Sequence, residues 1–174
     1  MKSGSTPLPA LARLLVLVLA ASLSAGLALA DDYSDISQML RAGRLAEART
    51  RVDRALAAKP RDPQMRYFKG VIQRDSGQQA EALTTFTKLT EDYPELPEPH
   101  NALAVIHAAQ GDLDKARRAL EMAIRVNPAY ATAHENLGDV YARLAVQAYC
   151  KALQLDANNS ALRSKLSTLG THCP

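Results

Sequence analysis

A repeat of 34 residues is the strongest constraint on the fold of this chain. Three kinds of residue recur with this spacing and in one phase, namely Gly43, Gly77 and Gly111; Pro60, Pro94 and Pro128; and Ala48, Ala82 and Ala116. The blocks therefore span about 29–62, 63–96 and 97–130, with a shorter fourth block over 131–157. Such a period indicates one supersecondary unit per block, and neighbouring units must stack because one unit cannot bury its apolar face alone.

Each block predicts a pair of helices, as the third block shows most clearly. Its apolar residues recur at three- and four-residue steps over 102–107 and again over 113–124, a helical period. Gly111 ends the first helix because glycine adopts the left-handed conformation that helix ends require. We expect Asp112 to cap the second helix and Pro128 to stop it. Apolar residues that are mostly Ala and Leu, with no Trp and two Phe, favour helices over sheets.

These blocks resemble tetratricopeptide repeats. The third block carries the family's pattern at Leu103, Ala104, His107, Gly111, Asp112, Ala116, Leu120, Ala123, Asn127 and Pro128. The second block matches it at Gly70, Gly77, Ala82, Phe86 and Pro94. Arg66, His100 and His134 stand where the family has Trp. The resemblance implies an all-α fold, a right-handed α-solenoid of antiparallel helix pairs.

The fourth block departs from the repeat because five residues are missing between its two helical segments, the turn glycine among them. An unbroken apolar stripe crosses the deletion, formed by Leu137, Tyr141, Leu144, Ala148, Ala152 and Leu155. The pattern predicts one continuous helix of about 25 residues, with a kink near Leu144 as the alternative. A short last helix is predicted over about 160–169, with Asn159 as its cap.

The straightened helix leaves its second half without a partner from its own repeat. The apolar face must then meet the last helix, a second chain or a client, because an exposed apolar stripe is a liability. Association into a homodimer through 144–169 is one hypothesis that follows.

The first thirty residues are typical of a signal peptide. Lys2 and Arg13 lie in a polar leader, an apolar run follows, and the small residues Ala28 and Ala30 precede the polar start at Asp31. We expect cleavage after residue 30, a mature domain over 31–174, periplasmic localisation and no membrane contact after cleavage. An uncleaved anchor is the alternative, since residues 14–30 approach the length of a membrane span.

Cys150 and Cys173 are the only cysteines. In an oxidising compartment two cysteines favour one disulfide, which would attach the C-terminal tail to the long helix. Pairing between two chains and two free thiols are the alternatives.

Neither catalysis nor a bound metal or cofactor is predicted. No His-Glu-x-x-His, Cys-x-x-Cys or glycine-rich phosphate loop is present, and His100, His107 and His134 occupy packing positions of the repeat. Without residues 1–30 the chain holds 19 basic and 18 acidic groups. This balance does not favour a nucleic-acid partner, which needs a clustered basic face.

The resemblance implies that the first helix of each pair lines a concave groove that binds a protein or peptide. The side chains expected in that groove are Tyr33, Ser37, Arg41, Gln64, Tyr67, Val71, Arg74, Glu98, Asn101, Val105, Ala108, Thr132, Glu135, Asp139 and Arg143. Tyr and Arg commonly anchor interfaces. The predicted function is a non-catalytic scaffold of the bacterial cell envelope. The alternatives are a self-associating structural protein and an accessory subunit of an envelope enzyme.

Overall fold

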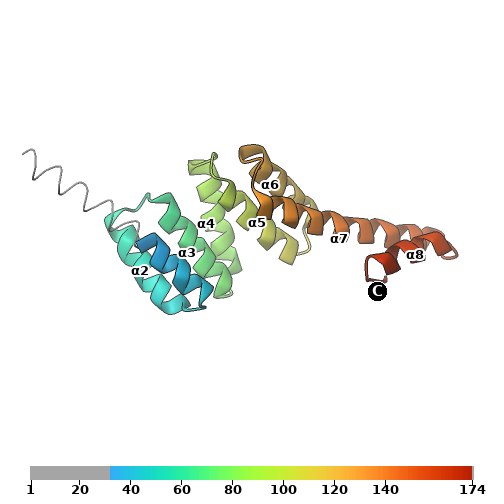
Figure 1. Ribbon diagram of the computed structural model, residues 1–174, viewed down its shortest axis with the longest axis horizontal. Coiled ribbons are helices and arrows are strands. Elements are labelled where there is room, and N and C mark those ends of the chain that lie inside the picture. Colours follow the sequence, from blue (N-terminus) through green and yellow to red (C-terminus); the bar gives the residue numbers. More distant parts are fainter. Residues whose placement is uncertain (1–31, 174) are drawn as a thin grey trace, which may run out of the picture. The chain divides into compact units, whose positions relative to one another are not determined.

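The computed structural model describes residues 32–173, and within this range it contains helices and no strand (Figure 1). Residues 32–41 form the first described helix. The others are α2 (Leu45–Ala58), α3 (Pro63–Asp75), α4 (Gln79–Asp92), α5 (Pro97–Ala109), α6 (Leu113–Val126), α7 (Ala131–Leu155) and α8 (Ser160–Thr168). The predicted all-α fold is confirmed. The predicted signal peptide lies outside the described residues.

Glycines at the repeat period end the first helix of each of the first three pairs. Gly43, Gly77 and Gly111 have φ angles of 70°, 80° and 83°, which residues with a Cβ adopt only with strain. The next residue in each case donates its N–H five residues back, as Asp112 N does to His107 O at 2.9 Å. This bond is the signature of a Schellman motif. The predicted end of the first helix at a left-handed glycine is therefore confirmed.

The predicted cap at Asp112 is wrong in its side-chain chemistry. Asp112 occupies the N-cap position of α6 but makes no side-chain cap hydrogen bond. Its carboxylate accepts instead from Lys115 Nζ at 2.8 Å, because the exposed ammonium one turn away competes for it. Asn159 does cap α8, where Leu162 N donates to its Oδ1 at 3.2 Å.

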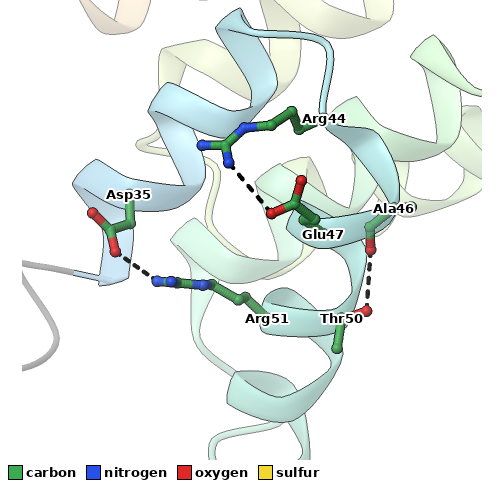
Figure 2. Close-up of polar contacts among 6 residues, drawn as sticks. All are labelled: Asp35, Arg44, Ala46, Glu47, Thr50 and Arg51. Carbon is green, nitrogen blue, oxygen red and sulfur yellow. Dashed lines mark hydrogen bonds and ion pairs between the residues drawn. The ribbon is translucent and has the colours of Figure 1, made fainter.

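The contacts divide the chain into two compact units, with the boundary between Phe68 and Lys69 inside α3. The N-terminal unit is centred on Ile36, Val52 and Met65, all almost fully buried. Its surface carries the ion pairs Arg51–Asp35 at 2.6 Å and Arg44–Glu47 at 3.3 Å (Figure 2). Both pairs are partly exposed to solvent, so each contributes little to stability.

The C-terminal unit packs α5 against α4 and α6, and α6 against α7. One buried cluster of this unit joins α5, α6 and α7 and is formed by Ala104, Leu113, Ala116, Leu120, Ala123, Ala133 and Val140. The predicted straight helix is confirmed, since α7 runs over 25 residues without a break. Figure 1 shows α8 folded back beside the C-terminal part of α7.

Candidate functional site

The candidate site is a cleft in the C-terminal unit, between α5 and α7. It encloses about 560 Å³ and is lined by Ala104, Val105, Ala108, Ala109, Leu120, Asn136, Asp139, Val140, Ala142 and Arg143. Four of these residues are alanines, whose side chains are too short to fill the space between the two helices. Val105 is 38% exposed on the cleft wall, so an apolar surface faces solvent here.

Polar groups frame this apolar wall at two places. Asn136 Nδ2 donates to Asn101 Oδ1 at 2.8 Å, which joins α7 to α5. Arg143 Nη1 donates to the Ala108 carbonyl oxygen at 2.9 Å, near the C-terminal end of α5. Among residues 32–173, no carboxylate lies within ion-pair distance of Arg143. Its charge and its other N–H groups therefore remain available to a ligand.

Three of the groove residues predicted as site candidates, Val105, Asp139 and Arg143, come together in this cleft. Ala108, expected in the groove on the same grounds, also lines it. Glu98 and Glu135 are exposed on the same helices. Asn101 is only 8% exposed and Val71 only 9%, so both are largely covered by neighbouring helices and offer little surface to a ligand.

Four of the other predicted groove residues, Tyr33, Arg41, Tyr67 and Arg74, already have contacts within their own unit. Tyr33 Oη donates to Asp62 Oδ2 at 2.6 Å, and this hydrogen bond, with burial, raises the pKa of Tyr33 to about 12. Arg41 Nη1 donates to Ser37 Oγ, and Arg74 Nε lies 2.8 Å from Asp75 Oδ1. The ring of Tyr67 lies 6.3 Å from that of Phe68. Gln64 is exposed.

Asn136 and Ala142 line the cleft but were not predicted from the sequence. Asn136 lies 35 residues after its partner Asn101, one step off the 34-residue period used to choose candidates. A search for polar residues flanking each predicted position would have found it. Ala142 carries no polar group, so only packing identifies it.

The C-terminal tail is attached to α7 by the Cys150–Cys173 disulfide, with Cα atoms 5.5 Å apart. The predicted pairing within one chain is therefore confirmed. Leu166 of α8 is buried, whereas Leu155 at the end of α7 is 81% exposed and Leu169 is 43% exposed. Part of the apolar surface of this region thus remains uncovered.

Comparison with known proteins identifies the family. Residues 40–97 match the family described as tetratricopeptide repeat, and residues 106–144 match the one described as TPR repeat. The chain is a tetratricopeptide repeat protein. The similarity extends to solved structures, where a thermophilic tetratricopeptide protein of Thermus thermophilus has a TM-score of 0.61 at 23% identity, over 80% of this chain and 97% of that one. The first tetratricopeptide domain of human RPAP3 has a TM-score of 0.59 at 15% identity, over 66% and 90%.

Two curated proteins share the repeat at higher identity. The chloroplast tetratricopeptide repeat domain-containing protein PYG7 of Arabidopsis thaliana is 36% identical over 45% of this chain. A probable biofilm formation methyltransferase of Pseudomonas putida, WspC, is 36% identical over 52% of it. The matched segments make up 28% and 21% of those proteins. Tetratricopeptide repeat proteins generally mediate protein–protein interactions, and the fold is typically a non-catalytic scaffold.

Across residues 32–173, no helix is long and apolar enough to cross a bilayer. The same residues contain no group of three or more His, Cys, Asp or Glu side chains placed to hold a metal ion.

Proposed function

We propose that this tetratricopeptide repeat protein is an exported, non-catalytic scaffold of the bacterial cell envelope that binds a protein segment in the α5–α7 cleft. The observation that carries the proposal is the cleft itself, whose apolar wall stands open to solvent beside an arginine with no carboxylate partner among the described residues. An apolar wall with a few directed polar groups is the usual make-up of a binding site.

The chemistry of the cleft favours a particular kind of ligand. Val105, Ala108 and Val140 offer room for an apolar side chain, and Arg143 offers N–H groups that suit a carboxylate. A protein segment with an apolar residue next to Asp, Glu or a free C-terminus would satisfy both. Asp139 on the same wall disfavours a ligand with acidic groups on both sides of that apolar residue.

Two sequence features support export. Residues 1–30 have the pattern of a cleavable signal, and disulfides persist in oxidising compartments such as the periplasm, which suits the Cys150–Cys173 bond. Intact mass measurement of the protein recovered from its native host would test this. A mature chain beginning at Asp31 is expected, and a full-length chain retained in the cytoplasm would contradict export.

Paired variants test binding in the cleft. Val105→Asp with Arg143→Ser places a charge on the apolar wall and removes the guanidinium. The control is Arg118→Ser, on the exposed face of α6. Partners captured by the natural protein should bind the cleft variant at least about tenfold more weakly, a loss of roughly 1.4 kcal/mol, and should bind the control unchanged. Equal binding by all three proteins would overturn the proposal.

The alternative of an accessory subunit stays a prediction. WspC, named as a methyltransferase, shows similarity to this chain over a segment that is 21% of its length. Copurification of an enzyme in stoichiometric amount with the natural protein, but not with the cleft variant, would favour the role of accessory subunit.

A further inference from the structure

In a regular repeat, one position on the first helix faces one position on the second helix of the same pair. In the first three blocks these positions hold Ile36 and Val52, then Gly70 and Phe86, then Ala104 and Leu120, and all six residues are buried. With the five-residue deletion taken into account, the fourth block has Gly138 and Tyr149 at these positions. Gly138 is exposed and Tyr149 only half-buried.

The second block shows what the fourth block lacks. A Cβ built on Gly70 would lie 2.6 Å from a ring carbon of Phe86, so the aromatic ring rests directly on the glycine. The fourth block again combines a glycine with an aromatic residue, a matched pair of small and large volumes. Yet a Cβ on Gly138 would meet no atom within 4 Å. The face of α7 that should receive an aromatic ring is empty.

Tyr149 of the same chain cannot fill this face. Gly138 and Tyr149 lie on one unbroken helix, α7, and eleven residues at 1.5 Å per residue separate them by roughly 16 Å along its axis. The turn that would fold the second half of α7 back onto the first is missing from the sequence. Loss of a hinge loop is a common cause of exchange between copies.

We propose that two copies of the chain pair through antiparallel α7 helices, each placing Tyr149 on Gly138 of the other. A second pair of positions supports the same register. Thr85 Oγ1 donates to Gln73 Oε1 at 2.7 Å between α4 and α3, and the corresponding residues of the fourth block are Ala148 and Tyr141. The midpoints of the pairs 138–149 and 141–148 lie half a residue before and half a residue after position 144, so one two-fold axis near Leu144 is compatible with both, as an isologous dimer requires.

The pairing covers surface that a single copy leaves open. Tyr141 is 49% exposed, and in the proposed dimer it faces Ala148 of the second copy. Ala145, Tyr149 and Ala152 are only half-buried. Their equivalents in α6, Ala116, Leu120 and Ala123, are at most 1% exposed.

The C-terminal hairpin can move into this arrangement as one piece. The disulfide holds the tail on the second half of α7, and Lys165 Nζ of α8 lies 5.4 Å from the centre of the Tyr149 ring. Both contacts remain within one copy. Neither Gly138 nor Tyr149 lines the α5–α7 cleft, so substitutions at these two positions test the dimer without changing a cleft residue.

The test is the molar mass of the oxidised protein by light scattering over micromolar to millimolar concentration. We expect a concentration-dependent dimer. Gly138→Gln adds a large polar side chain to a face that is open in one copy but occupied in the dimer, and it should weaken dimerisation at least about tenfold. Tyr149→Ala should weaken it similarly, whereas Ala80→Gln, at an exposed position of α4, should not.

Circular dichroism would establish that each variant keeps its helices, and Gly138→Gln in particular should fold because a Cβ at this position meets no atom within 4 Å in one copy. A monomer at every concentration would overturn the proposal. A dimer equally strong in Gly138→Gln and Tyr149→Ala would also overturn it.

Discussion

At the scale of single residues, the second repeat matches a small residue on one helix with a large residue on the other. Phe86 is fully buried, and its ring occupies the space above Gly70 that any side chain would need. Gly70 is therefore retained for space, whereas Gly77 is suited to a positive φ. Glycine is thus needed for two unrelated reasons within one block.

Replacing Gly70 with alanine tests the volume match. Although alanine gains about 1 kcal/mol in helix propensity over glycine, its Cβ would displace a fully buried ring. We expect a net loss of roughly 1–2 kcal/mol in the free energy of unfolding, measured by urea denaturation. Adding Phe86→Leu should recover part of the loss. A Gly70→Ala protein as stable as the natural one would show that the ring moves freely.

Two histidines, His100, which is buried, and His107, which is half-buried, predict how stability depends on pH. Burial lowers the pKa of His100, opposed by its hydrogen bond with the Pro94 backbone. Burial and then the charge of Lys115 lower the pKa of His107. Both side chains are thus uncharged in the fold to lower pH than in the unfolded chain, whose histidines take up protons near pH 6.5. Their contribution to stability is present above that pH and is lost as the pH falls through the folded pKa.

We therefore expect the free energy of unfolding to fall as the pH drops below about 6.5. His100→Phe with His107→Phe should reduce this fall, as followed by thermal denaturation at a series of pH values. An identical pH dependence in the double variant would assign the acid sensitivity to carboxylates.

At the scale of helices, the length of α7 follows from an absence in the sequence. No Gly, Pro or Asn lies between Asp139 and Ala157, so nothing ends the helix, and it continues to Leu155. The sequence also predicted α8, because Asn159 is a residue type that favours the N-cap position, and its Oδ1 does accept from Leu162 N.

The cleft could not be predicted to the same extent. Assigning groove positions by repeat number supposes that each points to solvent, but Val71 and Asn101 are covered by neighbouring helices. Whether Val105 stands beside a cavity depends on the sizes of Ala108 and Ala142 on two different helices. The apolar pattern of one helix does not contain this information, because the cavity depends on side-chain sizes on both helices.

The disulfide is predicted to hold α8 in place. α8 has nine residues and one buried side chain, Leu166, and an isolated helix of that length is unstable in water. Cys150→Ser with Cys173→Ser should expose the α8 amides to hydrogen exchange, while those of α5 and α6 keep their protection. Closing a loop of 23 residues is worth about 3 kcal/mol in the chain-entropy model. Unchanged protection in α8 would show that packing alone secures it.

At the scale of the whole molecule, the chain combines three regular tetratricopeptide repeats with a fourth whose two helices are fused. Because the similar curated proteins are matched over about a quarter of their length, what the chain shares with them is the repeat. The proposed client-binding role rests on the α5–α7 cleft, and the proposed self-association rests on the open face of α7.

Photo-crosslinking from the cleft in the native host is the most direct test of the scaffold proposal. A photoreactive amino acid replaces Val105, on the apolar wall, in one strain and Arg118, on the exposed face of α6, in another. The proposal predicts a discrete protein adduct from position 105 that is absent from position 118 and is lost when Arg143→Ser is added. The same adducts from both positions, or none from position 105, would contradict a binding role for the cleft.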